Sequence, residues 1–75
     1  MKKQTFIAII KDNTGKEISF ERFSCKRADT VKNNMVKLFN NDLYKACMKN
    51  AATVEIYSTT DGYNRDPGIV DTFTV

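Results

Sequence analysis

Residues 28–49 form a long segment whose apolar residues recur at helical spacing, and this segment limits the folds open to the chain. At about 100° per residue, its apolar side chains fall on one broad face. A stripe of this width is typical of a helix that lies on a sheet. The residues predicted on this face are Ala28, Val31, Met35, Leu38, Phe39, Leu43 and Ala46.

Asn40 and Asn41 interrupt this segment, and Asp42 projects close to the apolar face. Asparagine is a poor helix former because its side chain competes for backbone hydrogen bonds. It is also a favoured residue at a helix N-cap. The sequence therefore leaves two readings open: one continuous helix, or a break with a new helix start at Asn40 or Asn41.

Extended segments flank the helical segment on both sides. The run at residues 4–11 has apolar residues on both faces, which favours a central strand. A turn at residues 12–15 leads into a second strand at residues 16–23. Two further strands are predicted at residues 53–59 and 69–75, joined by a longer loop.

The second strand alternates cleanly between apolar and polar residues. Ile18 and Phe20 point one way, whereas Glu17, Ser19 and Glu21 point the other. This alternation predicts one solvated face. We expect Glu17 and Glu21 to lie at one side of the sheet face that the helix leaves uncovered.

The predicted fold is a single α+β domain over residues 1–75, with ββαββ order and a four-stranded sheet covered by one helix. This element order and the ending Asp71-Thr72-Phe73-Thr74-Val75 resemble the small immunoglobulin-binding domains of streptococcal surface proteins. The resemblance implies the β-grasp strand order 2-1-4-3, and we take only this topology from it. The fully antiparallel order 2-1-3-4 is the alternative.

The two cysteines lie at opposite ends of the helical segment. A helix rises about 1.5 Å per residue, which separates Cys25 and Cys47 by roughly 30 Å. A disulfide needs Cα atoms within about 7 Å, so we expect free thiols. Free thiols, with no apolar stretch long enough to cross a membrane and no export signal, predict a cytoplasmic protein.

The sequence lacks histidine and the residue patterns of common catalytic and metal sites. It contains no histidine, and its two cysteines lack the spacing of a zinc site. The glycines sit in isolated turns and form no phosphate loop. We therefore expect no enzyme, no catalytic residues, no cofactor and no metal site.

The first functional hypothesis is a small protein-binding or regulatory module, with a protein partner or a second copy of the chain as its ligand. The sheet face opposite the helix should be half apolar and rich in Tyr and Thr, which suits an interface. The loop tip pairs Tyr and Arg, two residue types favoured at interfaces. The predicted partner-binding residues are Tyr57, Thr59, Tyr63, Arg65, Thr72 and Thr74.

The alternative hypothesis is a nucleic-acid-binding accessory protein that uses the polar face of the helix. Eleven of the twelve basic residues lie in residues 1–50, and many of them are in or near the helical segment. Lysine, arginine and asparagine side chains bind phosphates. The candidates are Lys26, Arg27, Asn34, Lys37 and Lys45.

Overall fold

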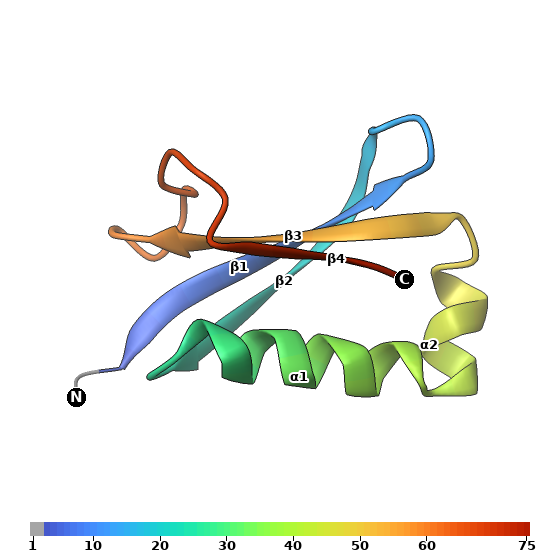
Figure 1. Cartoon of the computed structure of the whole chain (residues 1–75), viewed down its shortest axis with the longest axis horizontal. Coiled ribbons are helices and arrows are strands. Elements are labelled where there is room, and N and C mark those ends of the chain that lie inside the picture. Colours follow the sequence, from blue (N-terminus) through green and yellow to red (C-terminus); the bar gives the residue numbers. More distant parts are fainter. Residues whose placement is uncertain (1–2) are drawn as a thin grey trace.

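The computed structural model describes residues 3–75, and it contains one sheet and two consecutive helices (Figure 1). The strand boundaries lie within two residues of those predicted from the sequence. In chain order the elements are β1 (Gln4–Asp12), β2 (Glu17–Cys25), α1 (Ala28–Phe39), α2 (Asp42–Cys47), β3 (Ala51–Thr59) and β4 (Asp71–Thr74).

The strands form one sheet in the order β2-β1-β3-β4, and every neighbouring pair is antiparallel. The α+β class is confirmed, whereas the favoured β-grasp order 2-1-4-3 is wrong and the alternative order is observed. The physical reason is the difference between the last two strands. β3 is nine residues long and buries Val54 and Ile56, whereas β4 has four residues and no buried one. The longer, more apolar strand therefore takes the central place beside β1.

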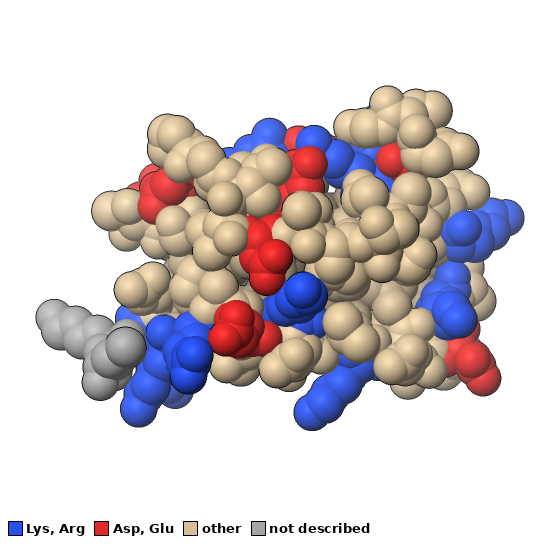
Figure 2. All heavy atoms as spheres, viewed as in Figure 1, with Lys and Arg blue, Asp and Glu red and all other residues tan. Residues whose placement is uncertain are grey.

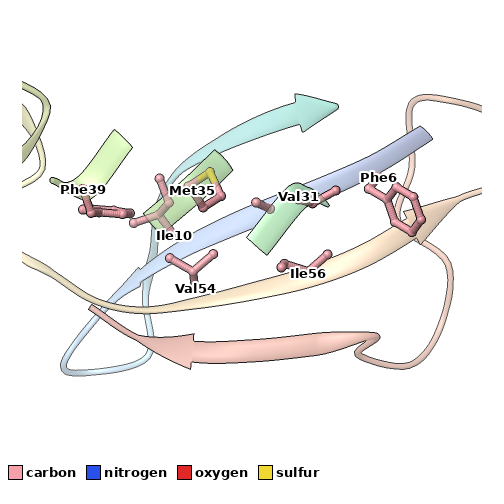
Figure 3. Packing of buried hydrophobic residues seen from close by; sticks show 8 residues of the cluster. Phe6, Ile10, Val31, Met35, Phe39, Val54 and Ile56 are labelled. Carbon is pink, nitrogen blue, oxygen red and sulfur yellow. The ribbon is translucent and has the colours of Figure 1, made fainter. Parts of the chain in front are cut away.

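The hydrophobic core lies between α1 and one face of the sheet. Val31 and Met35 of α1 are fully buried and lie over Ile10, Val54 and Ile56 of the two central strands (Figure 3). The helix runs below the sheet in the view of Figure 1. This layer matches the predicted packing of one helical face on the sheet.

The helical segment is broken at Asn40 and Asn41, one of the two readings that the sequence left open. The Oδ1 atom of Asn41 accepts hydrogen bonds from the backbone N–H groups of Leu43, at 2.9 Å, and Tyr44, at 3.3 Å. This N-cap starts α2 in a new direction. The prediction that Leu43 and Ala46 share the core face is therefore wrong, and both side chains are exposed.

The restart at α2 places Tyr44 against the core. Its ring packs edge to face on Phe39, with centroids 5.1 Å apart. Its hydroxyl donates a hydrogen bond to Glu21 at 3.5 Å. Burial and the negative charge of Glu21 raise the pKa of the Tyr44 hydroxyl.

A β-bulge near the first turn reverses the predicted faces of β2. Lys11 pairs with Glu17 and Ile10 with Ser19, so that Ile18 is the extra residue. After the bulge, Ser19 and Glu21 lie on the helix side of the sheet. The prediction that places Glu21 on the uncovered face is therefore wrong, while Glu17 does lie there.

Two further expectations from the sequence concern the cysteines and the absence of a membrane-spanning segment. Cys25 and Cys47 are free, as predicted from their separation. In the part of the chain that the structure describes, neither helix is long and apolar enough to cross a membrane.

Candidate functional site

The sheet face opposite α1, called the outer face below, is covered in part by the chain itself. Ile7 and Ile9 of β1 point to this face and are nevertheless buried. Residues 60–70, which connect β3 to β4, rise on the side of the sheet away from the helices (Figure 1). The central apolar strand is therefore sandwiched between α1 and a layer of loop and long polar side chains.

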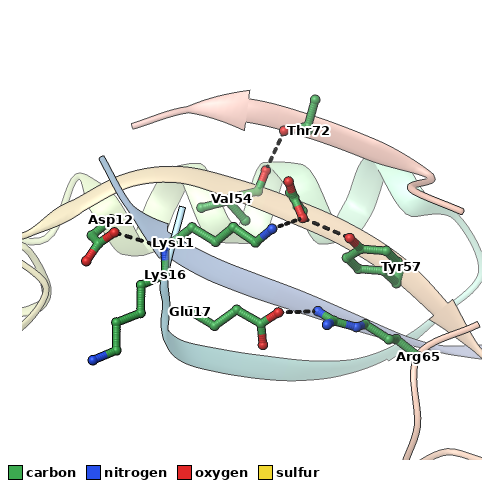
Figure 4. A network of polar contacts seen from close by, with 9 residues as sticks. Lys11, Asp12, Lys16, Glu17, Val54, Tyr57, Arg65 and Thr72 are labelled. Carbon is green, nitrogen blue, oxygen red and sulfur yellow. Dashed lines mark hydrogen bonds and ion pairs between the residues drawn. The ribbon is translucent and has the colours of Figure 1, made fainter. Parts of the chain in front are cut away.

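A polar network crosses the outer face of the central strands. Nζ of Lys11 lies 2.9 Å from Oε1 of Glu55, and the hydroxyl of Tyr57 donates to the same oxygen at 2.8 Å (Figure 4). Both charged side chains are largely buried, so this ion pair is less screened than an exposed one. The network holds β1 and β3 in register on their outer side.

Arg65 extends this network from the β3–β4 loop to β2. Its guanidinium lies 2.7 Å from the carboxylate of Glu17 and 5.0 Å from the centroid of the Tyr57 ring (Figure 4). The first contact is an ion pair and the second a cation–π contact. Together they hold the loop across β1.

The pKa shifts in this network all point away from neutrality. The hydrogen bond from Lys11 lowers the pKa of the Glu55 carboxyl, and the same bond raises the pKa of Lys11. Burial raises the pKa of Tyr57, and the hydrogen bond to Glu17 raises the pKa of Arg65. Each group thus keeps its ordinary protonation state near pH 7, whereas general acid–base catalysis needs pKa values tuned toward the working pH.

A second cluster of side chains on the outer face is exposed to solvent. The Arg22 guanidinium of β2 contacts two aromatic rings, 5.2 Å from the centroid of Phe20 and 5.9 Å from that of Tyr63. Its guanidinium also donates to the backbone carbonyl of Tyr63 at 3.5 Å. Phe20 is 50% exposed and Tyr63 74% exposed, so the two rings present apolar surface to solvent. We call Phe20, Arg22 and Tyr63 the contact cluster.

A polar hollow of about 430 Å³ lies where β1 begins and β3 ends. Asp66, in its wall, accepts hydrogen bonds from the hydroxyls of Ser58 and Thr60 and from the Thr60 backbone N–H. These bonds, the one from the Thr60 hydroxyl above all, lower the pKa of the Asp66 carboxyl. The hydrogen bonds of the Asp66 carboxylate thus stabilise the conformation of the β3–β4 loop. The hollow is lined by Lys3, Gln4, Thr5, Ser58, Thr59, Thr60 and Asp66.

The structure separates the six predicted partner-binding residues into four environments. Tyr57 and Arg65 belong to the polar network, and Thr59 is buried. Thr72 and Thr74 lie exposed on the short edge strand β4, where the Thr72 hydroxyl donates to the Val54 carbonyl at 2.9 Å. Tyr63 is the exposed ring of this set and belongs to the contact cluster.

Sequence reasoning missed Phe20 and Arg22, the two β2 members of the contact cluster. The predicted alternation of β2 holds after the bulge, from Ser19 onward, but it places Glu17 on the wrong face relative to Ser19 and Glu21. Alternation alone also cannot tell which face of the strand meets the helix. The signal that was available is the turn at residues 12–15, because a bulge beside a turn shifts every later side chain to the other face. The exposed Ile18 flanks the cluster on the same strand.

The predicted nucleic-acid-binding residues are not gathered into one surface. Arg27 pairs with Asp29 at 3.3 Å, and Asn34 is half-buried. Lys37 and Lys45 lie on different helices, with the break at Asn41 between them. In the view of Figure 2, basic side chains lie at separate places along the lower and right-hand edges, with acidic side chains among them. Lys26 is exposed just before α1.

Among residues 3–75, no three His, Cys, Asp or Glu side chains come together in a group that could hold a metal ion. A scan against protein-family models and searches of curated proteins and of solved structures found no match to this chain. The site is therefore interpreted from its own geometry.

Proposed function

We propose that this chain is a non-catalytic protein-binding module whose partner docks on the contact cluster. The observation that carries the proposal is the cation–π contact of Arg22 with two exposed aromatic rings, Phe20 and Tyr63. Tyrosine and arginine are enriched among the residues that dominate binding energy at protein interfaces. Phenylalanine is likewise enriched in the cores of interfaces.

The shape of the cluster supports a docking role because it is held in place before a partner arrives. Arg22 is fixed by two cation–π contacts and by the Tyr63 carbonyl. Arg65 and Glu17 tie the loop that carries Tyr63 to the same strand as Phe20. A surface that is already ordered loses less side-chain entropy when it binds.

The titratable groups support a binding role over catalysis. The shifted pKa values on the outer face move away from neutrality, and each carboxylate there is engaged by a cation, a hydroxyl or backbone N–H groups. We place the site of action in the cytoplasm, a compartment that suits the free thiols of Cys25 and Cys47.

The proposal is tested by affinity capture from an extract of cells that express the chain, followed by calorimetry with the purified captured protein. Phe20→Ser and Tyr63→Ala should each weaken binding at least tenfold, in the range of interface residues that contribute more than about 1.4 kcal/mol. The matched control is Leu43→Ser, because Leu43 is also apolar and 80% exposed but lies on α2. Thermal melts of all three variants establish that they fold.

A partner bound equally well by Phe20→Ser and Tyr63→Ala would refute the contact cluster as the docking site. Binding of DNA or RNA that declines steeply with salt, in place of a protein partner, would refute the proposal and favour the basic residues of the helices.

A further inference from the structure

The outer edge of β2 lies at one end of the sheet, and it adjoins the contact cluster. Within the described residues, no strand pairs with this edge. A free strand edge presents N–H and C=O groups that can bind another strand. The edge is therefore the place where a partner on the contact cluster can extend the sheet.

The register shows which residues of β2 present these groups. The Ile56 carbonyl accepts a hydrogen bond on the β4 side, so it points away from β1. Ala8, opposite Ile56, therefore directs its backbone groups to β2, where it pairs with Glu21. Backbone direction alternates along a strand, so Phe20 and Arg22 point their N–H and C=O groups outward. The free edge and the contact cluster thus share the same two residues.

This edge lacks two of the four features that normally block strand addition. Such features are short length, proline, bulges and charged side chains. β2 is nine residues long and has no proline, and its bulge lies at Ile18, near its start. Its three charged side chains are each engaged within the single copy. Arg22 lies over the rings of Phe20 and Tyr63, Glu17 pairs with Arg65, and Glu21 accepts a hydrogen bond from Tyr44. Residues 19–25 thus form a regular edge that can accept a strand.

We propose that the partner on this edge is a second copy of the chain, paired β2 to β2 in an antiparallel, two-fold symmetric arrangement. This inference rests on the proposed function and names its partner. The two sheets join into one of eight strands, and the outer faces of the two copies become continuous.

Charge along β2 excludes several registers for this pairing. A register centred on Glu21 places two glutamates opposite each other, and one centred on Arg22 opposes two arginines. A register centred on Ser19 opposes Glu17 and Glu21 of different copies. Like charges directly opposite each other destabilise a sheet.

Centring the two-fold axis on Phe20 avoids every such clash within the strand. A register centred on Phe23 avoids them too, but Phe23 packs against the core, so that register brings no exposed ring together. In the Phe20-centred register the two Phe20 rings face each other, and Ser19 of each copy lies opposite Glu21 of the other. Ile18, the bulge residue, ends the regular pairing near Arg22 of the other copy. Aromatic pairs across strands stabilise a sheet. Phe20 is 50% exposed and Ile18 38% exposed in a single copy, so the pairing buries apolar surface that is now in water.

Sedimentation velocity across a wide protein concentration range tests the inference. The wild-type chain should form a dimer that persists at high salt, because its centre is apolar. Phe20→Lys places two charges at the axis and should weaken dimerisation at least tenfold. Leu43→Lys is the control, since it adds the same charge to an exposed apolar position on α2 and should leave the dimer unchanged.

Single-cysteine variants test the register. Starting from Cys25→Ser and Cys47→Ser, one cysteine is placed at position 19, 20 or 24, and none of these changes alters a charge. Opposite residues in a hydrogen-bonded pair have Cα atoms about 5.5 Å apart, within disulfide range. Phe20→Cys should form a disulfide-linked dimer readily, whereas Ser19→Cys and Ser24→Cys should not.

A wild-type monomer at millimolar concentration would overturn the inference, as would a dimer unaffected by Phe20→Lys. The proposed function survives these results if Phe20→Ser and Tyr63→Ala still abolish binding of a different protein. A dimer that cross-links best at position 19 or 24 would overturn the Phe20-centred register.

Discussion

At the scale of single residues, Phe39 is the side chain that connects the two helices to the core. It is buried at the end of α1 and packs edge to face against Tyr44 of α2. Phe39→Ala should lower the free energy of unfolding by about 3–5 kcal/mol, the usual cost of removing a core aromatic side chain. Urea denaturation measures this loss. A loss below about 1 kcal/mol would contradict the packing of α1 on the sheet.

Asn41 is the residue that starts α2. Its side chain accepts two backbone hydrogen bonds, from Leu43 and Tyr44. Asn41→Ala should cost about 1 kcal/mol, the typical value for loss of an N-cap. Asn40→Ala is the matched control, because Asn40 caps α1 through its backbone N–H, which the substitution keeps. Equal losses in the two variants, measured by urea denaturation, would show that Asn41 does not cap α2.

Asp66 makes the stability of the β3–β4 connection depend on pH. Hydrogen bonds from Thr60 and Ser58 lower its pKa in the folded state. A carboxyl with a lowered folded pKa stabilises the fold above its ordinary value of 3.8, and this stabilisation is lost as pH falls through the folded pKa. Asp66→Asn should therefore reduce the loss of stability as the pH falls from about 5 to about 2. Thermal melts of the wild-type chain and of Asp66→Asn at each pH measure this difference in stability. Identical pH profiles of the two proteins would contradict the role of Asp66.

At the scale of elements, the sequence predicts each strand to within about two residues because turn residues and apolar alternation are local signals. The strand order was harder to predict because it depends on which strands pair. The β-grasp resemblance rested on the ending Asp71-Thr72-Phe73-Thr74-Val75. In the structure that segment forms a short edge strand, and the longer β3 lies beside β1.

The candidate site could be predicted only in part, again for reasons at the element scale. The sequence pointed to the outer face and to Tyr63, which is exposed there. It missed Phe20 and Arg22 because one bulge residue, Ile18, decides the face of the strand after it. The sequence also did not show that Tyr57 and Arg65 contact each other. This contact depends on how the β3–β4 loop folds back, which no local sequence pattern indicates.

At the scale of the whole molecule, the two faces of the sheet are stabilised in different ways. The inner face is an apolar core of residues from α1, β1 and β3. The outer face buries Ile7 and Ile9 under ion pairs and cation–π contacts that extend from Lys11 to Arg65. These contacts fill the middle of the outer face, and Phe20 of β2 and Tyr63 of the β3–β4 loop are exposed aromatic rings beside them.

Amide hydrogen exchange, followed by NMR at micromolar and at millimolar protein, tests most directly whether the β2 edge is the contact surface. Phe20 and Arg22 direct their N–H groups outward, so these amides should exchange rapidly in the single copy and slowly once β2 pairs with β2. Glu21 should be protected at both concentrations because its N–H bonds to β1. Equally rapid exchange of Phe20 and Arg22 at both concentrations would contradict pairing at this edge, as would new protection confined to β4 or α2.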